Sequence, residues 1–295
     1  MNLVIDKPTE SPHTYSYPNP FFNDPYIRTQ NMILYDISNI ALATAFTFHK
    51  NCDRVPEPTE LRNLITSSIG DMLPAISSYS GKHDVIALEG FKSWRKQKYP
   101  FYKAKRKAKR DERPFDFDAY YKHLSLVFED MKQYSNWLLL QHDEAEADDI
   151  ITTLALRAKK PVCIVSVDKD FLQLQSFKTD IVQYSPLKRD FLNPSEYKLM
   201  EHILGGDTVD GVPNIFNPED TFLTEGKRQT PFTKKLKDKL SHLEEEQLLQ
   251  ELTEEQKHRF FTNKELIDAR CVPVKIQEEI LQMAQDAYKA KMNRT

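Results

Sequence analysis

Acidic side chains follow three apolar segments of this sequence, at the point where each segment ends. Asp36, Glu89 and Asp168 each come directly after a run of aliphatic residues that is typical of a buried strand. Because the carboxyl ends of parallel strands form one edge of a sheet, where ligands bind, we expect these three carboxylates to face one site. An acid in this position is also common as a helix cap, so each one alone is a weak signal.

More acids occur in three short motifs. One motif opens a predicted helix as Glu-Ala-Asp-Asp, and its first and last acids, three residues apart, share a helix face. Another places an acid two residues after Asp168, and the last lies in a loop whose two glycines permit close approach of the backbone. These further acids are Glu146, Asp148, Asp149, Asp170, Asp207 and Asp210.

So many carboxylates in one place would repel each other unless cations neutralise them. Oxygen ligands without histidine or cysteine are typical of Mg²⁺, for which Mn²⁺ can substitute. Two such ions about 3.5–4 Å apart can activate a water and offset the charge of a phosphate. A helix start also favours acids through its dipole, but the joint arrangement favours a site for two Mg²⁺ ions. The predicted ligands are Asp36, Glu89, Glu146, Asp148, Asp149, Asp168, Asp170, Asp207 and Asp210.

A basic run begins two residues after Glu89. Residues 91–110 contain ten lysine or arginine residues and no acid, with five aromatic residues among them. Basic groups track a phosphate backbone, and aromatic faces stack on unpaired bases. A solvated helix or a targeting tract would explain the charge but not the aromatic residues, so we predict a basic arch over 91–113 that binds nucleic acid. Its predicted contacts include Arg95, Lys96, Lys105, Lys109 and Arg110.

The elements that position these residues alternate between strands and helices. Strands are predicted at Met32–Tyr35, Val85–Leu88, Trp137–Leu140 and Val162–Val167, and helices from Ser38 or Asn39 to His49, over Glu57–Ser77, after Pro114 and over Glu146–Arg157. Such alternation predicts an α/β fold with a central, mostly parallel sheet flanked by helices. We expect a catalytic core over residues 31–190 and a helical C-terminal subdomain over 191–295. Residues 1–30, which are poor in aliphatic side chains, are expected to be a flexible, proline-rich tail.

Composition limits the class of protein. Hydrophobic residues make up 40% of the chain and charged residues 29%, which is ordinary for a soluble protein. No apolar run approaches the roughly 20 residues that a membrane helix needs. The three cysteines form no CxxC pair, which argues against a zinc knuckle or a disulfide framework and fits a reducing compartment. We expect a cytoplasmic protein without membrane contact.

Taken in order, these motifs resemble those of the T-even phage ribonuclease H family, 5′→3′ exonucleases of the flap-endonuclease superfamily with a PIN-like core. The resemblance covers roughly Asn31–Lys289. Its carriers are Leu-Tyr-Asp-Ile-Ser-Asn-Ile-Ala-Leu at 34–42, Tyr102-Lys103-x-x-Arg106, Glu146-Ala-Asp-Asp149, Ser166-Val-Asp-Lys-Asp170 and Gly206-Asp-Thr-Val-Asp210.

The resemblance implies two groups of metal ligands. The acids matched to the first metal are Asp36, Asp148 and Asp168, with Glu146 between the two groups. The acids matched to the second are Asp170, Asp207 and Asp210.

The resemblance also implies an activity. Lys103 and Arg106 would contact the scissile phosphate, Tyr102 would stack on a base, and Asp36, Asp148 and Asp168 would complete the catalytic set. The reaction would be Mg²⁺-dependent removal of RNA primers and short DNA stretches at 5′ ends, in phage replication in the host cytoplasm. Substrates would be 5′ flaps, nicked duplexes and RNA–DNA hybrids, and candidate protein partners of the monomer are a single-strand DNA-binding protein and a sliding clamp.

Two features depart from the family pattern. Glu89 stands where relatives usually carry Asp, which moves the carboxylate by over an ångström, although an ion that keeps several waters tolerates such a change. The C-terminal half lacks the glycine-rich hairpin with which most relatives grip duplex DNA. Lys227, Arg228 and Lys234 are candidates for that contact, and an exposed lysine-rich helix is an equally good interpretation of them.

Two other functions compete with the nuclease. A haloacid-dehalogenase-type phosphatase also uses Asp-x-Asp after a strand, but that pair normally lies on the first strand, and this reading leaves the basic run unused. The second alternative is a non-catalytic module that binds nucleic acid, in which Glu89 would mark the loss of activity. Cleavage assays with flap, nicked and hybrid substrates, with and without Mg²⁺, separate the three.

Overall fold

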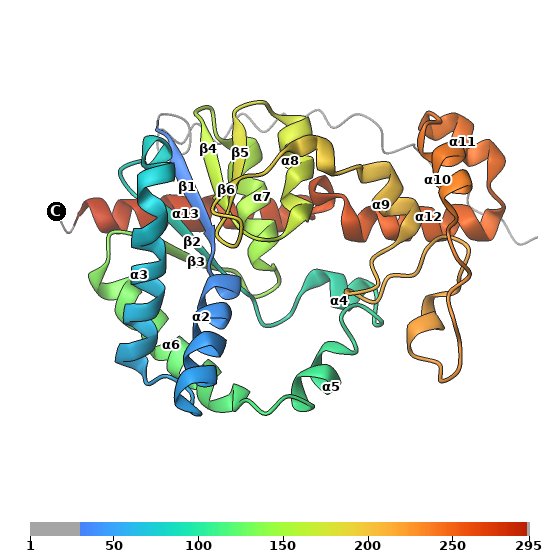
Figure 1. Cartoon of the computed structure of the whole chain (residues 1–295). Helices are drawn as coiled ribbons and strands as arrows, with labels where there is room; N and C mark the ends of the chain where they lie inside the picture. The colour runs from blue at the N-terminus through green and yellow to red at the C-terminus, as the bar shows by residue number, and fades with distance from the viewer. Residues whose placement is uncertain (1–29, 294–295) are drawn as a thin grey trace, which may run out of the picture.

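The computed structural model describes residues 30–293, apart from the side chains of residues 107–109. A six-stranded sheet forms its centre, in the order β3-β2-β1-β4-β5-β6 (Figure 1). The strands are β1 (Met32–Asp36), β2 (Val85–Leu88), β3 (Leu138–Gln141), β4 (Val162–Val165), β5 (Ile181–Ser185) and β6 (Asp190–Phe191). The tail expected over residues 1–30 lies almost entirely outside the described residues.

Five of the six strands are parallel, which confirms the predicted fold class. β6 pairs antiparallel with β5 at one edge. β1 lies between β2 and β4, with Leu34 opposite both Val85 and Ile164. The four strands predicted from sequence all occur, whereas β5 and β6 were not predicted.

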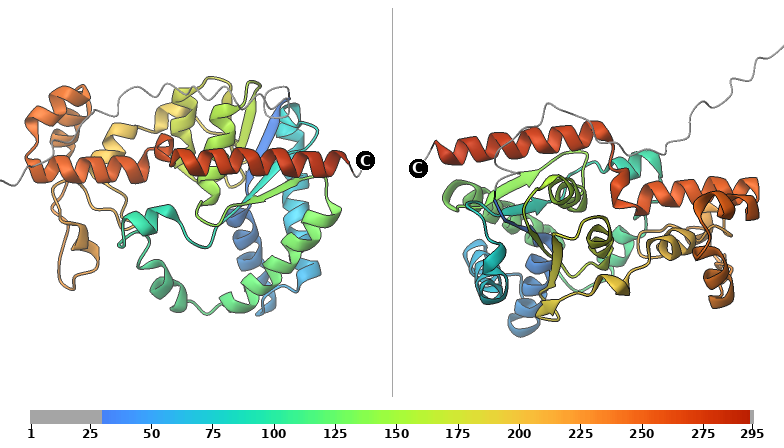
Figure 2. Two further views of the ribbon diagram at one scale, coloured as in Figure 1. Left: turned by 180° about the vertical axis from the view of Figure 1, so that it is seen from behind. Right: turned by 90° about the horizontal axis from the view of Figure 1, so that it is seen from above.

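Alternate residues of β1 pack on opposite faces of the sheet, as the period of a strand requires. Ile33 and Tyr35 face a cluster formed with helices α2 (Ile37–Cys52), α3 (Pro58–Ile76) and α6 (Phe117–Tyr134). Met32 and Leu34 face the other cluster. That second cluster includes helices α7 (Ala147–Arg157), α8 (Leu172–Phe177) and α13 (Val274–Met292). Figure 2 shows α13 along the face of the sheet opposite α2 and α3.

Sequence signals at the helix starts explain most of the boundaries. Glu57 and Glu60 form a capping box on α3, and Glu146 and Asp149 form one on α7. The expected cap of α2 at Ser38 or Asn39 is wrong, because β1 runs directly into the helix at Ile37. The Asn39 amide donates instead to the Asp36 carboxylate at 2.7 Å.

A third cluster lies beyond the end of the sheet and contains most of the remaining helices. These are α9 (Leu199–Gly205), α10 (Lys234–Ser241), α11 (Glu245–Glu251) and α12 (Glu254–Ile267). The basic segment joins β2 to α6 through α4 (Trp94–Lys98) and α5 (Arg106–Asp111), and its Tyr99 and Tyr102 belong to this cluster. Short 3-10 turns cover Ser77–Tyr79, Lys169–Phe171, Pro194–Glu196, Glu219–Phe222 and Ala269–Cys271. Within residues 30–293, no helix has the length and apolar character needed to cross a membrane.

Candidate metal and nucleic-acid site

Eight of the nine predicted metal ligands line one cavity of about 290 Å³. The parallel strands explain the convergence, because β1, β2 and β4 bring their carboxyl ends to the same edge. The start of α7 and the loop after α9 supply the rest. The eight acids are Asp36, Glu89, Glu146, Asp148, Asp168, Asp170, Asp207 and Asp210.

Asp36 lies at the centre of the first group of acids. Its carboxylate, 3% exposed, accepts hydrogen bonds at 2.7 Å from the Ser166 hydroxyl and from the Asn39 amide. These two hydrogen bonds lower the pKa of Asp36, but burial and the charge of the nearby Asp168 outweigh them, so the pKa is raised. Burial, together with the charges of Asp36, Glu89 and Asp168, raises the pKa of Asp148 well above its usual range.

Glu89 reaches the cavity despite its extra methylene group. Its carboxylate accepts a hydrogen bond from the backbone N–H of Ala147 at 3.3 Å, at the start of α7. The residue is exposed overall and lines both this cavity and a larger one beside it. Removal from bulk water and the charge of Glu146 raise its pKa to about 7. Glu in place of Asp therefore keeps a carboxylate in this site.

The second group of acids lies beside the turn after β4. Asp168 accepts a hydrogen bond from the Asp170 N–H at 2.9 Å, which fixes the turn. Burial and the charges of Asp168, Asp207 and Asp210 raise the pKa of Asp170 to about 7. The pKa of Asp207 shifts in the other direction. Burial raises this pKa, but His202 and the N–H groups of Val209 and Asp210 outweigh burial and hold it below the usual value.

His202 belongs to this second group and was not predicted from the sequence. Its Nε2 lies 3.4 Å from Asp207, and its Nδ1 lies 3.5 Å from Asp170. One ligand atom from each of these three residues falls within 4.8 Å of the other two. The only sequence signal is the spacing of five residues between His202 and Asp207 across the end of α9, which by itself carries little information.

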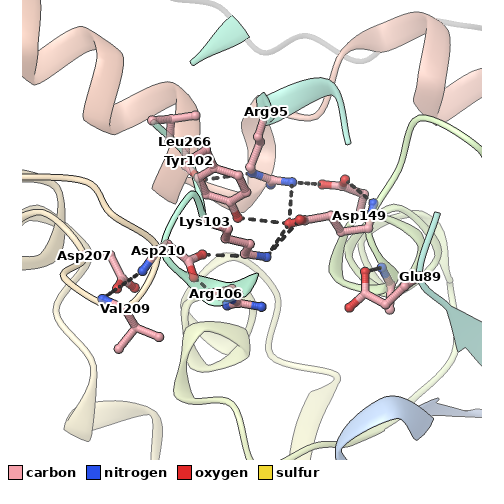
Figure 3. A network of polar contacts seen from close by, with 12 residues as sticks. Glu89, Arg95, Tyr102, Lys103, Arg106, Asp149, Asp207, Val209, Asp210 and Leu266 are labelled. Atoms are coloured by element: carbon pink, nitrogen blue, oxygen red, sulfur yellow. Dashed lines mark hydrogen bonds and ion pairs between the residues drawn. The ribbon is translucent and has the colours of Figure 1, made fainter. Parts of the chain in front are cut away.

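Three basic residues of the arch, Arg95, Lys103 and Arg106, line the acid cavity (Figure 3). Lys103 Nζ contacts Glu146 at 2.8 Å and Asp210 at 3.7 Å, and Arg106 contacts Asp210 at 2.6 Å. Lys103 has the left-handed φ of 54°, which is strained for a residue with a side chain. Its N–H donates to the Asp210 carbonyl at 2.7 Å, so the glycine loop and the arch hold each other in place.

Arg95 lines the cavity but forms a buried ion pair with Asp149, which does not line it, and this pair corrects both predictions. Arg95 is 6% exposed and donates to Asp149 at 2.8 Å and to the Leu266 carbonyl, so it is not a surface contact for nucleic acid. The second oxygen of Asp149 accepts from the Trp94 indole and from the Glu146 N–H. Asp149 therefore has no oxygen directed at the other acids.

Tyr102 also differs from its expected role. The residue is 4% exposed, and its hydroxyl donates to Glu146 at 2.9 Å. Its ring is packed inside the protein and is not available to stack on a base. Trp94 and Tyr99 are buried in the same way, because the arch needs an apolar anchor, whereas Phe91 is 79% exposed.

The remaining basic candidates lie at the surface. Lys96, Lys105, Arg106 and Arg110 line a larger cavity of about 1920 Å³ between the arch, α2 and α6. Arg110 lies 5.6 Å from the Phe117 ring. The side chain of Lys109 lies outside the described residues. Lys227, Arg228 and Lys234 are all exposed, and Lys227 pairs with Asp220.

Comparison with known proteins identifies the family. The model of the 5′-3′ exonuclease N-terminal resolvase-like domain matches residues 32–202, and that of the T4 RNase H C-terminal domain matches residues 193–294. The chain belongs to the 5′-3′ exonuclease family. It is similar to ribonuclease H of Enterobacteria phage T4, with 28% identity over 85% of each chain. A flap endonuclease Xni of Shewanella baltica is 32% identical over 55% of this chain and 63% of its own length.

Solved structures show the same fold. The phage T5 D15 protein co-crystallised with metal ions superposes with a TM-score of 0.60 and 17% identity, over 88% of this chain and 99% of that chain. A T5 D15 flap endonuclease pseudo-enzyme-product complex with DNA and metal ions also superposes with a TM-score of 0.60, at 16% identity. Membership of the exonuclease family makes this chain a nuclease and excludes the phosphatase reading.

The buried pair predicts a large stability loss for Asp149→Ala. Because this change leaves the Arg95 charge buried without a partner, we expect the free energy of unfolding to fall by about 3–5 kcal/mol, and Arg95→Met in the same background to recover part of it. Urea denaturation in a chelator measures both. The control Asp130→Ala breaks a surface pair with Arg62 and should cost at most about 1 kcal/mol. Equal losses in the two variants would contradict the structural role of Asp149.

The raised pKa values of Glu89 and Asp170, both about 7, predict a pH-dependent stability in chelator. Such carboxyl groups contribute stability below their unfolded pKa, and that contribution is lost as the pH rises towards about 7. The variant Glu89→Gln/Asp170→Asn should therefore gain stability over the parent between about pH 4 and pH 8. Glu60→Gln should lose stability relative to the parent as the pH rises from about 2 to about 4.5 and show little further change above that, because Arg54 lowers the pKa of Glu60 to about 2. A parent–variant difference that is constant with pH would contradict the assignment.

Proposed function

We propose that this protein is a Mg²⁺-dependent 5′→3′ exonuclease and flap endonuclease with ribonuclease H activity. It hydrolyses phosphodiesters near 5′ ends and removes RNA primers from lagging-strand fragments, in the cytoplasm of a phage-infected host. The observation that carries the proposal is the convergence of eight acids with Lys103 and Arg106 in one cavity. The similarity to phage T4 ribonuclease H supports the substrate class.

The donor set fits two hard divalent cations. Every acid lining the cavity offers oxygen, and the pKa values of Glu89 and Asp170, about 7, reflect partial desolvation and the crowding of carboxylates. Asp36, Asp148 and Asp168 would hold one ion, and Asp170, Asp207 and Asp210 the other. When bound, such ions lower the pKa of a water and offset phosphate charge.

The arch supplies fixed positive charge beside the acids. Lys103 and Arg106 are held by Glu146 and Asp210, so their cationic groups need little reorganisation when a phosphate arrives. We infer that they orient the scissile phosphate and stabilise charge developing on its oxygens. Lys96, Lys105 and Arg110, which line the larger cavity, would attract the backbone of an unpaired 5′ strand.

The N-terminal core and the helical C-terminal region have different roles in this proposal. The catalytic core over 31–190 would carry out hydrolysis, and the region over 191–295 would grip the duplex with Lys227, Arg228 and Lys234. A single-strand DNA-binding protein or a sliding clamp remains a candidate partner of the monomer, supported only by the family resemblance.

Asp168→Asn should abolish most of the hydrolysis of an end-labelled 5′ flap or RNA–DNA hybrid in Mg²⁺. Loss of one ligand removes several kcal/mol of charge stabilisation, so we expect the rate to fall about a hundredfold or more. Gel assays over time measure this, with Asp190→Asn, an exposed acid of β6, as the control. Tight flap binding by the parent without cleavage in any divalent metal would favour the non-catalytic module instead.

Lys103→Met should lower the single-turnover rate by about 10²–10³-fold, the range for losing one donor to developing charge. Flap affinity should change much less, because many phosphates share the binding energy. The control Lys105→Met, at an exposed neighbouring position, should mainly weaken binding and reduce the salt dependence of affinity. Unchanged turnover by Lys103→Met would remove this residue from the catalytic set.

A further inference from the structure

His202 is a nitrogen donor beside two acids, Asp170 and Asp207, of an otherwise oxygen-only site. It projects from α9 towards the turn after β4 and the glycine loop, so three separate segments meet at this point. We propose that His202 ligates a divalent cation together with Asp170 and Asp207, and that this half of the site prefers Mn²⁺ or another transition metal to Mg²⁺. The inference rests on the proposed metal-dependent function and specifies the chemistry of one of its two ions.

The separations match those of ligands around one ion. Neighbouring ligands of a metal with bonds of about 2.1 Å lie about 3.0 Å apart in an octahedral arrangement and about 3.4 Å apart in a tetrahedral one. His202 Nε2 and Asp207 are 3.4 Å apart, and one ligand atom from each of the three residues lies within 4.8 Å of the others. A direct charge-assisted hydrogen bond would normally be about 2.7–2.9 Å long. Nε2 and Asp207 therefore already have the spacing of two ligands, whereas the Asp170 carboxylate, which lies nearer to Nδ1, must move closer to Nε2 for all three donors to bind one ion.

The hydrogen bond with Tyr197 couples the hydroxyl to the choice of free nitrogen in His202. Its hydroxyl lies 2.8 Å from His202 Nδ1, and its ring meets the imidazole edge-on with centroids 5.6 Å apart. When Nδ1–H donates to the Tyr197 oxygen, the imidazole is neutral and Nε2 carries the free lone pair, directed at Asp207. Metal-bound histidines commonly use their second nitrogen in this way. Tyr197 is thus a positioning residue for the proposed ligand.

The site is open enough for an ion and its waters. The side chains of His202 and Asp207 are 19% and 21% exposed, and that of Asp170 is 42% exposed. Imidazole suits transition metals, whereas Mg²⁺ favours oxygen and retains its waters. A mixed set of one nitrogen and two carboxylates should therefore bind Mn²⁺ more tightly than Mg²⁺.

A different role for His202 predicts the opposite result. As a protonated imidazolium, the side chain would be a built-in counter-ion for Asp170 and Asp207 and would compete with metal. Removing it would then expose two uncompensated acids and strengthen metal binding. Removing a ligand would instead weaken binding of Mn²⁺, so the sign of the change separates the two roles.

The test is calorimetric titration of the full chain with Mn²⁺ and with Mg²⁺, without nucleic acid. His202→Ala should weaken Mn²⁺ binding by about tenfold or more, with a smaller change for Mg²⁺. His202→Gln should weaken Mn²⁺ binding in the same way. Circular dichroism of both variants shows whether α9 is still folded, so that loss of the ligand is distinguished from disruption of the helix. His258→Ala is the matched control, because this exposed histidine is near Glu219 and is not part of the Asp170–His202–Asp207 group.

Pulsed electron paramagnetic resonance of bound Mn²⁺ supplies a second readout. The parent and His258→Ala should show a hyperfine coupling to an imidazole nitrogen, which His202→Ala and His202→Gln should lack. Tyr197→Phe should keep the coupling and bind Mn²⁺ less tightly than the parent. Mn²⁺ binding by His202→Ala that equals or exceeds that of the parent would overturn the inference alone. A parent that binds neither metal would overturn the proposed function as well.

Discussion

Electrostatic repulsion among carboxylates is the constraint on which the rest of this structure depends. Eight acids from separate parts of the chain line a cavity of about 290 Å³, and burial together with their mutual repulsion raises the pKa values of Asp148, Glu89 and Asp170. The fold holds them together with a sheet edge, a helix start and a glycine loop, each fixed by packing elsewhere. Such a site stores unfavourable energy that a divalent cation would relieve.

Glu146 couples this site to the arch. Its carboxylate accepts from Tyr102 and from Lys103, and it lies 3.6 Å from Arg95. Those three cationic or polar partners hold its pKa below the usual value although burial opposes this. Because Arg95 is itself paired with Asp149 and bonded to Leu266, the base of the arch, α7 and α12 form one connected unit. The position of the basic residues over the acids follows from this unit.

Sequence patterns predicted the sheet and the location of the acids well, because both depend on local rules. A strand followed by an acid is a local signal, and parallel pairing brings Asp36, Glu89 and Asp168 to one edge. Patterns could not tell which acids of Glu146–Asp149 face the cavity, since that depends on Arg95, which lies 54 positions before Asp149. The burial of Tyr102 and the approach of His202 likewise depend on how the C-terminal helices dock, which no local pattern encodes. β5 was missed although it is a parallel neighbour of β4.

Anomalous diffraction from crystals grown with Mn²⁺ tests the central claim most directly. We expect two anomalous peaks within the acid cavity, one beside Asp36, Asp148 and Asp168 and the other beside Asp170 and Asp207, about 3.5–4 Å apart. Peaks at other acidic surfaces, with the cavity acids dispersed or bonded only to Lys103 and Arg106, would contradict the account.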